Sequence, residues 1–377
     1  MRNIEQCSEC GVPSMVSSGL NWEGNGVISL ANSPRNRMVF FESEAIDKIF
    51  KGIEELIGMP IEHIVIESRC RETKRYIERA FPPEVRKIID STESSLEERI
   101  EKMTPEEKET LLATMKVITQ TIIDFARNYG YGDQRPGELW ESGGGYPWRV
   151  QEVRNPYSLL FIAADNIGAI EAFEGASMQV KYEEMEADSY RIEVFSGEHP
   201  LALRERLKRR RYDFKPGDMT YERCPECGIP MAVASRRWDL DEGTITDPDT
   251  GRRMAIFGPF AVDSIFDDLE AELGHDVPDT VIEATRRYIK MAWGVDEWNR
   301  DGLTFQQMIT VRGLGNLTHF EGDRDHLDVV IENSCLHLPV VGTVQALVEM
   351  AYRVESSSVA WTLAEDGDLS VTVNIKR

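Results

Sequence analysis

The chain has 377 residues, of which 41% are hydrophobic, and its formal net charge is −23. This length can bury the cores of two or more domains, whereas the negative charge opposes binding to nucleic-acid phosphates. The start of the chain does not resemble a signal peptide, and no stretch approaches the ~18 apolar residues of a membrane span. We therefore expect a soluble, cytoplasmic protein with no membrane span and no nucleic-acid partner.

Two Cys-x-x-Cys-Gly motifs, which we call knuckles, begin at Cys7 and at Cys224 and indicate an internal duplication. A shift of 217 in the numbering superimposes them, and seven of the twelve positions from 7 to 18 are then identical. The residues of the first knuckle region that recur in the second are Cys7, Glu9, Cys10, Gly11, Pro13, Val16 and Ser18.

A second run of identities follows each knuckle. With a shift of 216, nine of the twenty-two positions from 37 to 58 match their counterparts from 253 to 274. We predict a first copy over residues 1–216 and a second copy over 217–377. A linker at 200–216, which contains a run of basic residues, ends the first copy and is either a docking patch or a solvated connector.

After each knuckle comes a segment that resembles a short hairpin strand, around 27–30 in the first copy and 243–246 in the second. An amphipathic helix is expected next, because apolar residues recur at helical spacing before Gly58 and before Gly274. Since glycine is typical of the position that follows a helix, both helices are expected to end there.

A second helix is predicted over 64–79 in the first copy and over 280–291 in the second. The first copy alone then adds a helical insert at about 94–130. Within it, Thr104-Pro-Glu-Glu107 is a capping box with proline at the first helical position, which predicts that a helix begins there.

The last part of each copy has the alternating or continuous apolar pattern of strands, and a short helix near Gly168 or Gly342 interrupts it. The predicted fold class is therefore α+β and internally duplicated. Each copy is expected to contain a zinc-ribbon-like knuckle, helices and an antiparallel sheet with a short helix, the β-rich parts spanning about 148–196 and 317–377. The predicted strands are Trp148–Val153, Ser158–Ile162, Val180–Glu184, Tyr190–Phe195, Leu327–Glu332, Val359–Leu363 and Leu369–Ile375.

The four knuckle cysteines, Cys7, Cys10, Cys224 and Cys227, are predicted to bind one metal ion. A Cys-x-x-Cys turn offers two thiolates to a tetrahedral ion, but a complete site needs four ligands. Because neither copy has a second local pair, we expect the knuckles to combine into one shared site, with Zn²⁺ as the usual structural ion. Alternatively, each knuckle completes its site with another chain, which would give a metal-bridged oligomer.

A redox dithiol is the competing interpretation of the knuckles. Such a pair needs a helix N-terminus that lowers a thiol pKa, and Gly11-Val-Pro13 and Gly228-Ile-Pro230 argue against a helix at either pair. The knuckles resemble zinc ribbons and also rubredoxins, and the second resemblance implies iron and electron transfer. Since tetrahedral thiolates suit both metals, the sequence leaves zinc and iron as alternatives.

Outside the knuckles we find no phosphate loop and no dinucleotide-binding motif. We also expect no second metal centre, because the six histidines are scattered. Cys70 and Cys335 have no counterpart in the opposite copy, and each is expected to be a buried core residue. Cys335 precedes His337 by two residues, which would place both side chains on one face of a strand. Solvated helix faces are expected for four polar residues of the short helices, which are Glu171 and Glu174 in the first copy and Gln345 and Glu349 in the second.

The order of the final segments is strand, asparagine turn, strand, glycine-bearing helix and terminal hairpin, and it resembles the 4-vinyl reductase domain over Trp148–Phe195 and Leu317–Ile375. This resemblance implies an α+β pocket for small hydrophobic molecules, such as aromatic effectors or tetrapyrrole precursors. Some members of that family bind a metal through a cysteine cluster. Here only Cys335 lies in the matching region, which counts against a metal site of that type.

These features favour a metal-stapled binding or accessory protein that is not an enzyme and that serves a small hydrophobic ligand or a protein partner. An iron-containing electron carrier or a reductase-type enzyme is one alternative. A non-catalytic subunit of a larger complex, or a homo-oligomer, is the other.

Overall fold

The structure is a computed structural model, and the part of the chain that it describes divides into two compact units. The boundaries of these units differ from those of the two copies predicted from the sequence. Most of the first predicted copy after residue 61 forms the second unit. The predicted basic linker lies mostly outside the described residues. The first unit comprises Met1–Ile61, Lys208–Trp238 and Ile245–Arg377, and the second comprises Glu62–Leu207 and Asp239–Thr244. The described residues are 5–86, 96–142, 145–199, 212–294, 305–323 and 325–375.

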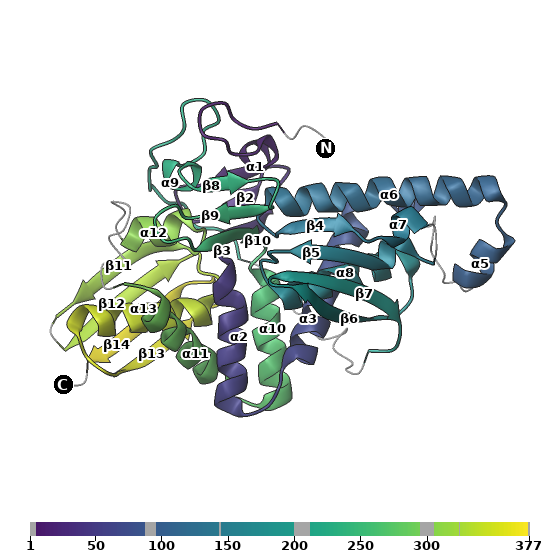
Figure 1. Cartoon of the computed structure of the whole chain (residues 1–377). Coiled ribbons are helices and arrows are strands. Elements are labelled where there is room, and N and C mark those ends of the chain that lie inside the picture. Colours follow the sequence, from purple (N-terminus) through teal and green to yellow (C-terminus); the bar gives the residue numbers. More distant parts are fainter. Residues whose placement is uncertain are drawn as a thin grey trace. The chain divides into compact units, whose positions relative to one another are not determined.

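A six-stranded sheet, whose strands belong to the first unit except for Asp239 and Thr244, joins strands of both predicted copies (Figure 1). The hairpin strands expected around 27–30 and 243–246 are confirmed as β2 and β9. The strand order β1-β2-β3-β10-β9-β8 places the three strands of one copy beside the three strands of the other in reversed order. The bounds are β1 (Leu20–Trp22), β2 (Ile28–Leu30), β3 (Ser33–Glu42), β8 (Arg237–Asp239), β9 (Thr244–Thr246) and β10 (Arg253–Phe257).

The two predicted copies meet at the centre of this sheet, where β3 and β10 pair in antiparallel register. Phe40 pairs with Ile256, which is its own counterpart under the shift of 216, and the pairs on either side are reciprocal. Phe41 and Phe257 are also counterparts, and their ring centroids lie 6.3 Å apart. A two-fold axis between two equivalent strands would produce this register.

Helices α2 (Ser43–Ile57) and α10 (Phe260–Leu273) confirm the amphipathic helices expected in the two copies. Each ends at the expected glycine, because Gly58 has φ +74° and Gly274 has φ +107°, backbone conformations that other residues adopt only with strain. Their buried apolar stripes are Ile46, Ile49, Phe50 and Ile53 in α2, and Val262, Ile265, Phe266 and Leu269 in α10.

The first unit also contains a four-stranded antiparallel sheet of order β11-β12-β14-β13. Buried and more exposed residues alternate along β14, so one face of the sheet is covered, and helix α13 contacts β13 and β14. On its other side α13 contacts α11, which confirms the second predicted helix of the second copy. The bounds are β11 (Asn316–Gly322), β12 (His326–Glu332), β13 (Ser357–Leu363), β14 (Leu369–Ile375), α11 (Val277–Ala292) and α13 (His337–Tyr352).

The second unit repeats this plan with a sheet of order β4-β5-β7-β6. Helix α8 contacts the sheet and also α3, which confirms the second predicted helix of the first copy (Figure 1). The bounds are β4 (Asp133–Pro136), β5 (Val150–Arg154), β6 (Met178–Glu186), β7 (Ser189–Ser196), α3 (Glu62–Ala80) and α8 (Leu159–Glu174).

The helical insert of the first copy is confirmed where it is described. Helix α6 (Pro105–Asn128) follows α5 (Leu96–Lys102) in the second unit. At its start the Glu107 N–H donates to Thr104 Oγ1 and the Thr104 N–H donates to the Glu107 carboxylate, which is the predicted capping box.

One predicted strand is wrong, because Ser158–Ile162 forms the N-cap and first turn of α8. Ser158 Oγ accepts the Phe161 N–H at 3.3 Å, and the apolar run that follows belongs to a helix buried on most sides, a pattern that resembles a buried strand. The preceding asparagine turn is present, since Asn155 has φ +53°. Strand β4 was not predicted, because Asp133–Pro136 has no apolar alternation.

These elements confirm the α+β class. No helix of the described part of the chain combines the length and the apolar character needed to cross a membrane. The remaining elements are α1 (Ser14–Gly19), α4 (Pro83–Arg86), α7 (Leu139–Ser142), the 3-10 helix η1 (Pro147–Arg149), α9 (Met231–Ala234) and α12 (Phe305–Val311).

Candidate metal centre

Each knuckle is a tight turn closed by backbone hydrogen bonds. In the first, the Cys7 N–H donates to Val12 O and the Gly11 N–H donates to Cys7 O, both at 2.9 Å, and the turn at Cys224 repeats both bonds at the same lengths. Gly11 and Gly228 each have φ +74°, so glycine relieves strain where the chain turns back. Each knuckle therefore presents two cysteine side chains from one rigid turn.

The structure brings the four predicted ligands together within the first unit. Cys7 Sγ lies 3.8 Å from Cys224 Sγ, Cys10 Sγ lies 3.5 Å from Cys227 Sγ, and all four sulfur atoms lie within 4.8 Å of one another. In a tetrahedral zinc site, with zinc–sulfur distances of about 2.3 Å, the sulfur atoms are about 3.8 Å apart. The four cysteines can therefore hold a metal ion.

The first cysteine of each knuckle is more deeply buried than the second. Cys7 and Cys224 are buried, whereas Cys10 and Cys227 are half-buried. Hydrogen bonds from backbone N–H groups at Cys227 and Glu226 lower the pKa of Cys224 to about 7. Burial raises the pKa of Cys10 and of Cys227, although a backbone N–H opposes each shift. Four thiolates this close would repel one another, and a bound cation would offset that repulsion.

Glu226 joins the two knuckles through hydrogen bonds. Its Oε2 accepts the Ser8 hydroxyl at 2.6 Å and the Glu9 N–H at 3.1 Å, and it lies 3.4 Å from Cys7 Sγ. The Ser8 and Cys7 hydrogen bonds lower the pKa of the Glu226 carboxyl. This carboxylate of the second knuckle therefore fixes the backbone of the first.

Neither cysteine pair lies at the start of a helix. Helix α1 begins at Ser14 and α9 begins at Met231, each directly after the proline of the Gly-x-Pro sequence. The turns thus precede the helices, as the prolines predict, and helix dipoles do not act directly on the paired thiols in the manner of a redox dithiol.

A second group of potential metal ligands lies in the second unit, where the sequence analysis found no metal centre. Cys70 on α3, Glu171 on α8 and His199 after β7 have ligand atoms within 4.8 Å of one another. These residues are too far apart in sequence for any spacing motif. The available signal was on α3, where Glu67, Cys70 and Lys74 follow one another at intervals of three and four residues and so share a helix face.

The expectation of solvated helix faces for Glu171, Glu174, Gln345 and Glu349 is wrong. These residues are 1%, 0%, 7% and 0% exposed. Helices α8 and α13 are apolar around most of their circumference, so the glutamates are covered together with their apolar neighbours. Glu174, for example, accepts the Trp148 Nε1–H at 2.9 Å and pairs with Arg149.

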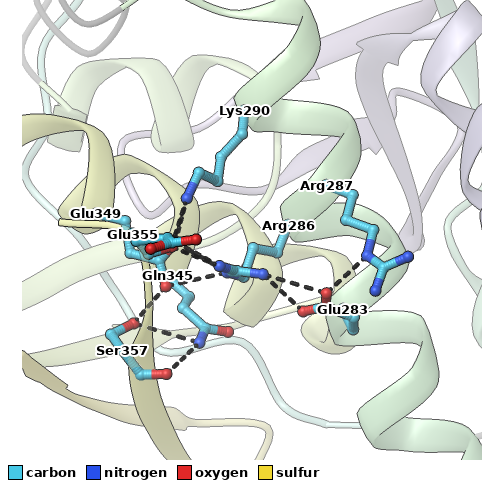
Figure 2. A network of polar contacts seen from close by, with 8 residues as sticks. All are labelled: Glu283, Arg286, Arg287, Lys290, Gln345, Glu349, Glu355 and Ser357. Atoms are coloured by element: carbon cyan, nitrogen blue, oxygen red, sulfur yellow. Dashed lines mark hydrogen bonds and ion pairs between the residues drawn. The ribbon is translucent and has the colours of Figure 1, made fainter. Parts of the chain in front are cut away.

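Buried Glu349 is the centre of a charge network in the first unit (Figure 2). Arg286 Nε lies 2.9 Å from Glu349 Oε2, Lys290 Nζ lies 2.7 Å from the same oxygen, and Ser357 Oγ donates to Oε1 at 2.8 Å. Burial raises the pKa of the Glu349 carboxyl, but these three partners outweigh burial and lower it. The carboxylate is therefore a structural anion between α11, α13 and β13.

Cys335 and His337 do not share a strand face, contrary to expectation. Cys335 lies in the turn before α13 and His337 is the first residue of that helix. Cys335 is buried, as expected, and its thiol contacts Gly313 O at 3.4 Å, whereas the His337 ring lies against Trp361 with centroids 5.5 Å apart. Cys70 is likewise buried, at 3% exposure.

Comparison with known proteins adds no further assignment. No protein-family model, no curated protein and no solved structure matches the chain.

Proposed function

We propose that Cys7, Cys10, Cys224 and Cys227 bind one structural zinc ion, and that the chain is a metal-stapled binding or accessory protein rather than an enzyme. The observation that carries the proposal is the convergence of four cysteine sulfurs from two rigid turns within 4.8 Å. Cys10 and Cys227 are 217 residues apart, so one ion would link distant parts of the chain. Zinc is the metal that such closed four-thiolate sites usually hold.

The symmetry of the first unit supports a duplicated origin for this site. The strand order reverses about the β3–β10 pair, where counterpart residues face each other. Counterparts also meet between α2 and α10, at Phe50 and Phe266, and between the knuckles, at Cys7 and Cys224. Two half-sites on either side of a two-fold axis form one complete site at that axis. We infer that the knuckles are equivalent halves of a duplicated chain and that neither half binds the ion alone.

We assign the binding role to the two sheet-and-helix modules, β4-β5-β7-β6 with α8 and β11-β12-β14-β13 with α13. Their shared strand order, with the helix inserted between the second and third strands, supports the resemblance to the 4-vinyl reductase domain. That resemblance favours a small hydrophobic ligand over a protein partner. A test is native mass spectrometry of gently purified protein: a co-purifying small molecule supports this role, and a co-purifying polypeptide supports the accessory role.

The metal is tested by elemental analysis and a visible spectrum of protein purified without oxygen. Zinc at the four cysteines without colour supports the structural proposal. Iron with thiolate charge-transfer bands would instead favour electron transfer, because the same four thiolates suit iron. A native mass measured before and after chelation distinguishes a site within one chain from a bridge between chains, since only the bridged oligomer dissociates.

A further inference from the structure

His199 lies between two carboxylates of the second unit. Its Nε2 is 2.5 Å from Glu171 Oε1, and its Nδ1 contacts the Glu67 carboxylate. The His199 side chain is 7% exposed. The two carboxylates therefore create a buried position that strongly favours a cation.

Cys70 adds a sulfur ligand to this position. It lies in the contact between α3 and α8, where Gly168 allows close approach: a Cβ on Gly168 would lie 2.5 Å from Cys70 O. The Cys70 sulfur lies within 4.8 Å of the ligand atoms of Glu171 and His199. A thiol, an imidazole and a carboxylate that converge in this way form the ligand set of a three-residue zinc site, whose fourth position is left for water.

The groups around these ligands also suit a metal. A metal-bound histidine usually directs its second ring nitrogen at a carboxylate, and the Glu67 carboxylate contacts Nδ1 of His199. Lys74 Nζ lies 3.3 Å from Glu171 Oε2, which leaves Oε1 toward His199. The Met178 N–H donates to Oε1 at 2.9 Å and orients the carboxylate further.

Backbone contacts anchor the segment that carries His199. The Gly197 N–H donates to Ser177 O at 3.2 Å, and the Gln179 side chain donates to Glu198 O at 2.5 Å. The residues just before His199 are thereby fixed beside the start of β6, close to the end of α8. The imidazole thus comes from a supported segment, as a ligand must if a site is to be preorganised.

The first unit has a glutamate, Glu349, at the position that corresponds to Glu171, but without a cysteine and a histidine beside it in the part of the chain that the structure describes. Glu171 and Glu349 each lie twelve residues after the first residue of a 16-residue helix, 159 to 171 and 337 to 349. Glu349 is neutralised by Arg286 and Lys290, whose cationic groups are donors only. Among the described residues, Glu349 belongs to no group of potential metal ligands. The buried glutamate is common to both modules, whereas the cysteine and histidine are found in one.

We propose that Cys70, Glu171 and His199 bind a second zinc ion in the second unit, with Glu67 as a positioning residue. The site is independent of the four-cysteine site. Binding exchanges the protons of the Cys70 thiol and of His199 Nε2 for bonds to the metal. With zinc–nitrogen and zinc–oxygen distances of about 2.0–2.1 Å, the Nε2–Oε1 separation opens to roughly 3.4 Å.

The experiment measures zinc per chain in the full-length protein after it is loaded with Zn²⁺ and freed of excess. We expect two ions in the wild type and one in both Cys70→Ala and His199→Gln. Cys335→Ala is the matched control, because it removes another buried cysteine that belongs to neither ligand group, and it should retain two. Cys10→Ser should also lose one ion, but from the other site.

The outcomes separate this inference from the proposed function. One zinc per chain that persists in Cys70→Ala and His199→Gln and is lost in Cys10→Ser overturns the second site and leaves the first intact. One zinc per chain that persists in Cys10→Ser and is lost in Cys70→Ala and His199→Gln overturns the first site alone. Zinc-edge X-ray absorption of the wild type avoids variants that fail to fold: a shell of mixed sulfur and nitrogen or oxygen supports the second site, and sulfur alone contradicts it.

Glu67→Gln tests the positioning role by a measurement of affinity. Because a carboxylate behind a ligating histidine typically contributes 10- to 100-fold to metal affinity, we expect competition with a chelator to show a loss of about that size. The zinc content at saturation should stay at two. An unchanged affinity would contradict the role of Glu67, and a change in the ion held by the four cysteines would show a general structural effect instead.

Discussion

Because Glu349 is buried, its loss is expected to have a large effect on the free energy of unfolding. Replacement by glutamine removes the charge and leaves Arg286 and Lys290 without their anion, so we expect Glu349→Gln to lower the free energy of unfolding by about 3 kcal/mol at pH 7. Glu283→Gln is the control, because that side chain is 33% exposed and also pairs with Arg286 (Figure 2). An exposed pair of this kind contributes at most about 1 kcal/mol.

The same residue predicts a pH dependence. The folded protein lowers the pKa of Glu349 below the ordinary value, so its contribution to stability is complete above the unfolded pKa and is lost as pH falls through the folded pKa. The difference in unfolding free energy between wild type and Glu349→Gln should therefore be constant near neutral pH and shrink at acidic pH. Denaturant titrations at several pH values measure it, and a difference that grows with acidity would refute this account of the network.

Single residues differ in whether the sequence alone predicts their role. The four knuckle cysteines were identifiable because a repeated short motif carries its own chemistry. Glu171 and Glu349 were not, because their partners lie on other helices and a glutamate in an apolar helix has no local pattern that indicates burial. His199 escaped notice for the same reason, since its two carboxylates come from α3 and α8.

At the scale of elements, the contact of α3 with α8 depends on Gly168. A Cβ there would lie 2.5 Å from Cys70 O and 2.8 Å from Lys74 N, so backbone must shift. We expect Gly168→Ala to destabilise the protein by about 1–3 kcal/mol, although alanine is the better helix former by ~1 kcal/mol. Gly52→Ala should cost less, because the new Cβ would lie 3.1 Å from the Ala284 side chain. Equal or reversed effects in denaturant unfolding would contradict the packing argument.

Helix α6 depends on its first turn. Thr104→Ala removes the side-chain oxygen that accepts the Glu107 N–H, and we expect a loss of about 1 kcal/mol. Thr114→Ala removes a hydroxyl that bonds within the exposed middle of the same helix, so its effect should stay within ~0.5 kcal/mol. Amide hydrogen exchange of the first turn of α6 tests the cap directly: protection that is equal in the two variants would argue against it.

Elements with a clear period or cap were predictable, and those defined by partners were not. The capping box, the two glycine helix ends and the 3.6-residue stripes are local features and are confirmed. The run after Ser158 is apolar on nearly every side, so its period does not distinguish a buried strand from a buried helix. Strand β4 exists because β5 pairs with it, and its four residues have no strand pattern of their own.

At the scale of the whole molecule, the two knuckles come together although they are 217 residues apart in the sequence. The repeat in the sequence predicted that the two knuckles would combine. The register of β3 with β10, in which counterparts also pair, was not predicted, although it fits the shift of 216. The division into compact units was not predictable in the same way, because residues 62–207 form a unit apart from the knuckle that precedes them.

The shared four-cysteine site also predicts how a bound metal affects the unfolding midpoint. An ion that binds only the folded arrangement of both knuckles adds its binding free energy to folding. Chelation of the four-cysteine ion should therefore lower the unfolding midpoint, and Zn²⁺ should restore it. The control is Cys10→Ser, whose unfolding midpoint should respond to a chelator less than that of the wild type. An equal response would place the stabilising metal elsewhere.

The most direct test of the shared site is the zinc content of Cys10→Ser, Cys227→Ser and the double variant. If both knuckles hold one ion, each single variant loses the same ion, and the double variant loses no more than either. Independent sites, one at each knuckle, would give losses that add, so the double variant would lose two ions. Zinc content equal to that of the wild type in all three variants would contradict metal binding by these cysteines altogether.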